Sequence, residues 1–233
     1  MLRTDWWRLL VVLGPATVLV VLGAAGFAGV LEAVREREDL WVADDAVLGW
    51  VVDHRTPAAT TFFTVVTNGF GPYVLPVVVA VGCVVWWRVS GAWRDPLLLV
   101  GAMLLSTLVS TVLKAVIARP RPPAESMTVA GVETSFSFPS GHTIGAATLV
   151  LVSGYLVWAR HRTGRRLVVW AVTSLAVVAV VGASRLYLGY HFVTDVVASV
   201  CLAVAVLGVV VGVHTWVSGG PAETVHEGER VDD

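Results

Sequence analysis

The chain has 233 residues, of which 56% are apolar and only 14% are charged, and its mean hydropathy is +0.78. A soluble domain usually has about 45–50% apolar and about 25% charged residues, so this composition excludes a disordered chain and argues against a soluble globular domain. The net charge of −1 gives no basis for binding nucleic acid. Because a spanning helix needs about 20 apolar residues, we predict one all-α membrane domain over residues 1–217, a helical bundle with about six transmembrane helices.

The first predicted span, at about 9–30, lies between Arg3 and Arg8 on one side and an acidic stretch at 32–39 on the other. Small residues near 24–28 would also suit the cleavage site of a signal peptide. The apolar run is long for the central part of such a peptide, so an uncleaved membrane anchor is favoured.

Residues 40–57 mix apolar and charged side chains at helical spacing, which is typical of a short helix lying in the membrane interface. The second predicted span, at about 62–87, contains Asn-Gly-Phe-Gly-Pro at 68–72 and then Pro76. Helix breakers are tolerated in a membrane only where neighbouring protein satisfies the freed backbone groups. The segment is therefore either one bent span or a short helix followed by a shorter span.

Four further spans are predicted at about 96–117, 140–158, 167–183 and 192–216. Six spans place both chain ends on one side of the membrane, together with Arg88, Arg94 and the basic loop 160–166. The positive-inside rule makes that side cytoplasmic. The acidic, Gly-containing tail at 218–233 is predicted to be disordered there, and the loops at 118–138 and 184–191 are predicted to face away from the cytoplasm.

Cys83 and Cys201 lie inside apolar runs and are predicted to be buried free thiols, without a disulfide or a metal site. No cluster of carboxylates or histidines suits Mg²⁺ or Zn²⁺, so neither a metal nor another cofactor is expected. Four histidines match no motif and are predicted to be non-catalytic: His54, His161, His214 and His226.

Polar and ionisable side chains gather at the outer ends of the third to sixth predicted spans. Such residues are rare at these positions unless they have a function. They form three short segments, KAVIARPRP at 114–122, FPSGH at 138–142 and SRLYLGYHFVTD at 184–195.

The last segment holds a histidine and an aspartate that share one helix face, because His191 and Asp195 are spaced i, i+4. A carboxylate at that position can accept the proton of one imidazole nitrogen. The other nitrogen then presents an oriented lone pair, which is a nucleophile.

The remaining polar residues suit the binding of a phosphate dianion. The start of the fourth span at Ser140 offers free backbone N–H groups and the positive end of a helix dipole, and Gly141 lets the backbone approach closely. His142 adds a second acid or base. Three fixed positive charges complete the set: Lys114, Arg121 and Arg185. Together these residues indicate phosphoryl transfer without a metal.

The three segments resemble the signature motifs of the type 2 phosphatidic acid phosphatase (PAP2) family. K-x6-RP, PSGH and SR-x5-H-x3-D match in residue type, spacing and order over about 80 residues. The resemblance implies a metal-independent lipid phosphatase, in which the residue matching His191 forms a phosphohistidine. The residue matching His142 protonates the leaving oxygen, and the one matching Asp195 orients the nucleophile. Those that hold the phosphoryl oxygens match Lys114, Arg121, Ser140, Gly141 and Arg185.

Three charged residues near these motifs are left outside the predicted site. Arg119 does not fit the K-x6-RP spacing and is predicted to be an interfacial cation whose stem lies along apolar surface. Glu125 and Glu133, in the loop over the site, are given no role.

The sequence leaves the substrate open among undecaprenyl diphosphate, other polyprenyl phosphates, phosphatidic acid and phosphatidylglycerol phosphate, each met in the lipid bilayer at the outer face. A phosphotransferase, in which a hydroxyl other than water accepts the phosphoryl group, has the same motifs. A protein that only binds or transports phospholipid is a further alternative, but binding alone would not need His142 and the His191–Asp195 pair. The oligomeric state is not predicted.

Overall fold

The computed structural model describes residues 6–129 and 133–218, and its regular secondary structure there is entirely helical. This confirms the predicted all-α class. Apart from Ser218, the predicted disordered tail lies outside the described residues. The helices are α1 (Trp6–Glu36), α2 (Val42–Asp53), α3 (Pro57–Gly69), α4 (Val74–Ser90), α5 (Arg94–Ile117), α6 (Gly141–Arg160), α7 (Gly164–Tyr187) and α8 (Val193–Val217), with short 3₁₀ turns η1 (Asp39–Trp41) and η2 (Ala124–Ser126).

Five of these helices, α1, α5, α6, α7 and α8, are long and apolar enough to cross a membrane. The pair α3 and α4 makes a sixth span when taken together, bent by 55° where the two helices meet. The bend falls at the predicted breakers, since α3 ends at Gly69 and α4 begins at Val74. The chain is therefore a multi-pass membrane protein, as predicted.

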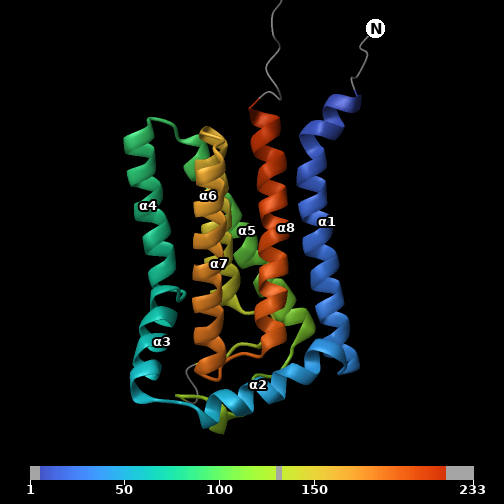
Figure 1. Ribbon diagram of the computed structural model, residues 1–233, viewed down its shortest axis with the longest axis vertical. Coiled ribbons are helices and arrows are strands. Elements are labelled where there is room, and N and C mark those ends of the chain that lie inside the picture. Colours follow the sequence, from blue (N-terminus) through green and yellow to red (C-terminus); the bar gives the residue numbers. More distant parts are fainter. Residues whose placement is uncertain (1–5, 130–132, 219–233) are drawn as a thin grey trace, which may run out of the picture.

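The long helices stand side by side, and the short helix α2 lies across one end of the bundle (Figure 1). This helix falls within residues 40–57, where the sequence predicts a short interfacial helix. The beginning of α1 and the end of α8 both lie at the opposite end (Figure 1). The bundle thus has one end that is crossed by α2 and one end that carries the chain termini.

Helix α6 occupies the centre of the bundle, because it packs against α5, α7 and α8. Its Ala147, Val152 and Leu156 side chains are fully buried. Large apolar side chains on the outer helices, such as Leu108 and Leu175, are exposed instead, as expected of surfaces that face lipid. The central position of α6 fixes its first residues, Gly141 and His142, within the end that α2 crosses.

Helix α7 is longer than the sequence suggests, since it continues to Tyr187 instead of ending near 183. The polar residues of its last turn have local partners: the Ser184 hydroxyl donates to the Val181 carbonyl, and the Leu188 N–H donates to the Ser184 carbonyl. The chain then reverses at Gly189, whose φ of +76° suits a residue without a side chain. Arg185 therefore projects from a helix, not from a turn.

Candidate active site

All three motifs meet at the end of the bundle that α2 crosses. Helix α5 ends at Ile117, and the left-handed φ of +50° at the next residue, Ala118, turns the chain into the loop that leads to the second motif. Ser140 caps α6 by accepting from the Thr143 N–H at 3.4 Å. Asp195 caps α8 by accepting from the Phe192 N–H at 3.0 Å. Helix capping thus sets the position of two predicted site residues.

The predicted histidine–aspartate pair is formed. His191 Nδ1 lies 3.1 Å from Asp195 Oδ2, and the two residues are 2% and 0% exposed. Since a carboxylate oxygen only accepts, Nδ1 carries the proton of the neutral ring. The free lone pair is then on Nε2, which faces the Arg121 guanidinium at 3.3 Å. Asp195 therefore orients the ring so that the unprotonated nitrogen points away from it.

Burial, together with the positive charges of Arg185, Arg121 and Lys114, holds the pKa of His191 well below its usual value. The imidazole is therefore neutral at physiological pH. A neutral imidazole retains the lone pair that a nucleophile needs.

The three predicted cations lie around the same space and are held by fixed acceptors. Lys114 Nζ donates to the carbonyls of Phe136 and Ser137, at 2.5 and 3.1 Å. Arg121 donates to the Ser135 and Tyr190 carbonyls, at 2.7 and 2.9 Å.

Arg185 is held differently, because it is 1% exposed and lies beneath other side chains. Its Nη1 donates to the Thr67 hydroxyl of α3 at 2.5 Å. Its Nε is among the few buried side-chain nitrogens in the described residues that have no hydrogen-bond partner. A buried, unpartnered donor is expected where an anion binds.

Glu133 is a site residue that the sequence analysis left unassigned. Its carboxylate bridges the two arginines, accepting from Arg121 Nη2 at 3.0 Å and from Arg185 Nη2. Burial alone would raise the pKa of Glu133, but Arg185 and Arg121 lower it below its usual value, so the group is a carboxylate. Three cations and one carboxylate leave a surplus of two positive charges, which matches a phosphate dianion.

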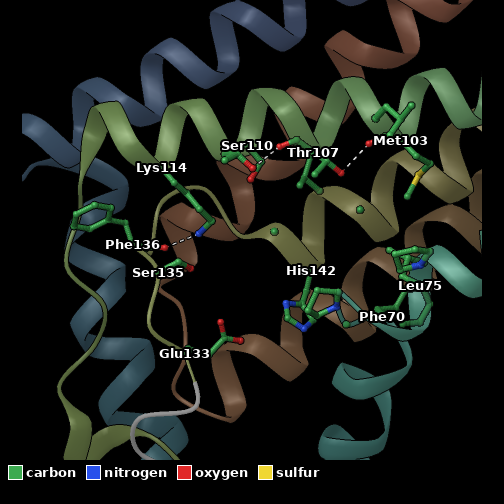
Figure 2. Close-up of a pocket in the computed structure, with 18 of the residues that line it drawn as sticks. Phe70, Leu75, Met103, Thr107, Ser110, Lys114, Glu133, Ser135, Phe136 and His142 are labelled. Carbon is green, nitrogen blue, oxygen red and sulfur yellow. Dashed lines mark hydrogen bonds between the residues drawn. The ribbon is translucent and has the colours of Figure 1, made fainter.

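A cavity of about 740 Å³ opens beside these groups. Figure 2 shows Lys114 and Phe136 on one side of it, His142 on the opposite side, and the Glu133 carboxylate pointing into the space between them. Five of the eight predicted site residues line the cavity: Lys114, Arg121, Gly141, His142 and His191. The other three do not line it: Ser140 is fully buried and bonded to Thr143, whereas Arg185 and Asp195 are buried and bonded to the lining residues Glu133 and His191.

The apolar part of the cavity runs along α4 and α5. It is lined by Val100, Met103, Leu104 and Thr107 of α5, and by Leu75, Pro76, Val79 and Ala80 of α4. The cavity lining on α5 runs from Lys114 back to Val100. These residues are 14 positions apart, so the lining is about 21 Å long at 1.5 Å per residue.

The prediction for Arg119 was wrong. This residue is only 6% exposed, and its guanidinium forms ion pairs with Asp195 at 2.7 Å and with Asp44 at 2.8 Å. It is thus part of the protein interior directly behind the histidine–aspartate pair. The sequence carried no periodic signal for this contact, because its carboxylate partners lie 75 and 76 residues away.

Residues 95–218 match the sequence profile of the PAP2 superfamily. Phosphatidylglycerophosphatase B of Bacillus subtilis is 33% identical over 174 residues, which cover 73% of this chain and 82% of that protein. The lipid A 4′-phosphatase of Porphyromonas gingivalis is 31% identical over 125 residues, or 48% of this chain and 50% of that protein.

Among solved structures, the crystal structure of a transmembrane PAP2-type phosphatidylglycerolphosphate phosphatase from Bacillus subtilis superposes with a TM-score of 0.72 at 28% identity, covering 87% of this chain and 97% of that one. The helical bundle and the profile match together define a membrane-embedded phosphatase. The chain belongs to the PAP2 superfamily.

Proposed function

We propose that the protein is a metal-independent phosphatase that hydrolyses a lipid phosphate or diphosphate through a phosphohistidine on His191. The observation that carries this proposal is the His191–Asp195 pair, in which His191 Nδ1 lies 3.1 Å from Asp195 Oδ2. His191 lines the same cavity as His142. A neutral imidazole with one nitrogen bound to a carboxylate has its other nitrogen ready to attack.

In the first step, His191 Nε2 attacks phosphorus and forms a P–N bond. The P–O bond to the lipid breaks in line, and its electron pair goes to the leaving oxygen. His142 donates a proton to that oxygen, so a neutral alcohol, or the shorter phosphate of a diphosphate, departs. Lys114, Arg121 and Arg185 stabilise the charge on the equatorial oxygens, and the Ser140–Gly141 segment adds the N-terminus of α6.

In the second step, His142 returns as a base. It takes a proton from a water molecule, whose oxygen attacks phosphorus, and the P–N bond breaks with its electron pair returning to Nε2 of His191. Inorganic phosphate leaves, and Asp195 still holds the Nδ1 proton of His191. One histidine thus carries the phosphoryl group while the other carries protons in both steps.

The position of Glu133 supports a phosphate dianion as the ligand. Its carboxylate occupies donors of Arg121 and Arg185 that phosphoryl oxygens would use, so the substrate takes over these donors and displaces the carboxylate. Gly141 faces open space, where an added Cβ would meet no atom within 4 Å. This space beside the start of α6 is available to a phosphoryl oxygen.

The apolar part of the cavity supports an amphiphilic substrate. About 21 Å of lining along α5 suits an acyl or prenyl tail better than a small soluble ester. Figure 2 shows Thr107 and Met103 following Lys114 along that helix. Phosphatidylglycerol phosphate is the first lipid to test, because the Bacillus subtilis relatives bear that activity in their names. Phosphatidic acid and polyprenyl diphosphates present the same phosphate chemistry.

The decisive experiment is a phosphate-release assay of the purified full chain on these lipids, with EDTA present and with His191→Ala as the control. We expect release from at least one lipid, undiminished by EDTA and absent in the variant. Transfer of labelled phosphate to an added alcohol in place of water would assign a phosphotransferase. Loss of activity on chelation that Mg²⁺ restores would contradict the proposal.

The site is further proposed to face away from the cytoplasm. Arginines gather at the opposite end of the bundle, at Arg88, Arg94 and 160–166. Among the described loops and helix ends there, Asp95 is the only acidic residue, so the positive-inside rule makes that end cytoplasmic. Single cysteines at Glu125 and Thr163, in a chain lacking Cys83 and Cys201, test this orientation. An impermeant reagent on intact cells should label position 125 and not 163, whereas the reverse pattern would overturn it.

A further inference from the structure

Arg119 belongs to a closed network of buried side chains. Its Nη1 donates to Asp195 Oδ1 at 2.7 Å and to the Thr194 hydroxyl at 2.6 Å, while Nη2 donates to Asp44 Oδ2 at 2.8 Å. Asp44 also accepts from the Thr194 N–H at 3.0 Å and from its hydroxyl at 2.6 Å. We call these four residues, Arg119, Asp44, Thr194 and Asp195, the buried network.

The guanidinium of Arg119 also lies close to two aromatic rings, those of Trp41 and Phe192, whose centres are 6.3 Å apart. Its central carbon lies 4.7 Å from the ring centre of Trp41 and 4.3 Å from that of Phe192. At these distances the ring faces attract the guanidinium cation. Arg119 therefore has one orientation, set by η1, by the turn before α8 and by two carboxylates.

This arrangement divides the two oxygens of Asp195 between two partners. Oδ1 accepts from Arg119, whereas Oδ2 accepts from the Phe192 N–H, from the Ser137 hydroxyl and from His191 Nδ1. The Ser137 N–H in turn donates to the Arg119 carbonyl at 2.9 Å. If Arg119 were lost, the carboxylate could rotate, and its hold on His191 would no longer be fixed.

We propose that Arg119 and Asp44 are positioning residues for the nucleophile: Asp44 on α2 fixes Arg119, and Arg119 fixes Asp195 so that Oδ2 is presented to His191. This inference rests on the proposed role of His191. It gives α2 a function beyond lying in the interface, since this helix supplies a fully buried carboxylate to the site. Neither Arg119 nor Asp44 lines the cavity, so neither contacts substrate.

The test uses full-length protein in detergent, with p-nitrophenyl phosphate as substrate and inorganic phosphate as competitive inhibitor. Arg119→Met should lower kcat by about 10²-fold, because small displacements of reacting groups have effects of that size. The inhibition constant of phosphate should stay within about threefold, since the three proposed phosphate-binding cations, Lys114, Arg121 and Arg185, remain. Arg160→Met is the matched control: Arg160 pairs with Asp95 at 2.7 Å at the far end of the bundle, and its loss should leave kcat unchanged.

A double-mutant cycle distinguishes positioning from mere stability. If Arg119 acts through Asp195, then Arg119→Met should cost less than about threefold in an Asp195→Asn background. An equal loss in both backgrounds would overturn the inference, as would unchanged kcat in Arg119→Met. A parallel rise in the phosphate inhibition constant would overturn it too, because it would place Arg119 among the phosphate-binding groups.

If Arg119→Met fails to fold, Arg119→Lys and Asp44→Asn give the same test. Each should lower kcat by a smaller factor, and the double variant should lose no more than Arg119→Lys alone, because Asp44 acts through Arg119. Additive losses would overturn the inference. His191→Ala, measured alongside, keeps the two proposals apart: turnover in that variant would refute the proposed function, whereas an inactive His191→Ala with unaffected Arg119 variants would refute only the positioning role.

Discussion

Two arginines that stand two residues apart in the chain, Arg121 and Arg119, belong to opposite kinds of environment. Arg121 lines the cavity with Lys114, and its carboxylate partner, Glu133, is 20% exposed in its side chain. Arg119 lies in the buried network, where both carboxylate partners are fully buried. The cavity wall has a surplus of positive charge, while the network has one cation for two carboxylates. Groups that bind an anion keep donors that a ligand can take over, whereas both terminal nitrogens of Arg119 donate to side chains of the buried network.

His191 joins the two regions, with Nε2 toward the cavity and Nδ1 toward the network. Substitutions on the cavity side should therefore depend on the substrate, whereas substitutions in the network should affect all substrates alike. The following predictions test this division, beginning with the largest expected effect.

His142→Ala should have the largest effect that depends on the substrate. A lipid alkoxide is a strong base and needs a proton as it leaves, whereas p-nitrophenolate is a far weaker base. General acid help is worth about 10²–10⁴-fold, so most of the lipid rate should be lost and a smaller part of the p-nitrophenyl phosphate rate. The measurement is single-turnover release of the leaving group. If His142→Ala lowered the rates on both substrates equally, His142 would act as a positioning residue and not as the general acid.

A bulky side chain in the apolar part of the cavity should discriminate between substrates by size. Ala80 lines the cavity on α4, whereas its neighbour Val81 is 58% exposed and does not line it. Overpacking costs about 1–3 kcal/mol, so Ala80→Phe should lower kcat/KM for a lipid phosphate by about tenfold and leave p-nitrophenyl phosphate unaffected. Val81→Phe is the control and should change neither. A similar loss on both substrates would show that the tail lies elsewhere.

Removing the charge of Glu133 should tighten the binding of a small anion. Glu133→Gln replaces a charged partner of Arg121 and Arg185 with a weaker neutral one. We expect inorganic phosphate to inhibit about fivefold more strongly, a gain of about 1 kcal/mol. Glu125→Gln, at an exposed position of the same loop, should have no effect. Weaker inhibition in Glu133→Gln would mean that the carboxylate supports the site and does not compete for it.

The smallest effect concerns the protonation of His191. Burial and the charges of Arg185, Arg121 and Lys114 lower the pKa of His191 well below its usual value. A group with a lowered pKa loses its proton at a lower pH, so the neutral ring should persist as the pH falls from 8 to 6 and be lost only below that. Nitrogen NMR of labelled histidines, with the His191 signal identified by its absence in His191→Asn, should report neutral shifts at pH 6. A midpoint near about 6.5 would contradict this electrostatic account.

Much of the fold could be predicted from composition, because apolar runs of spanning length leave few alternatives to a helical bundle. The end of α7 could not, since its apolar run stops near 183 while the helix continues for another turn. That turn makes tertiary contacts that no local pattern indicates, among them those of Arg185 with Thr67 of α3 and with Glu133. The helix breakers in the sequence indicated the bend between α3 and α4. They did not indicate that the bend lies against α6, where a Cβ at Gly71 would be 3.6 Å from His142 Nε2.

The candidate site shows the same limit. Lys114, Arg121 and the two histidines were recognisable because their motifs are compact in sequence and fall at span ends. Arg119 was mistaken for an interfacial cation because its partner Asp44 belongs to α2, and no local spacing relates the two. Glu133 gave no signal, because a loop glutamate is ordinary until folding brings two arginines to it.

The central claim is that His191 carries the phosphoryl group, and trapping the intermediate tests it most directly. Full-length protein should be mixed with ³²P-labelled lipid phosphate, quenched in alkali within the first turnover, and mapped by mass spectrometry. We predict an acid-labile label on His191. It should be absent from His191→Ala, and with p-nitrophenyl phosphate as donor it should accumulate in His142→Ala, where the base for hydrolysis is missing. Label on another residue, or turnover by His191→Ala without any labelled intermediate, would contradict the account.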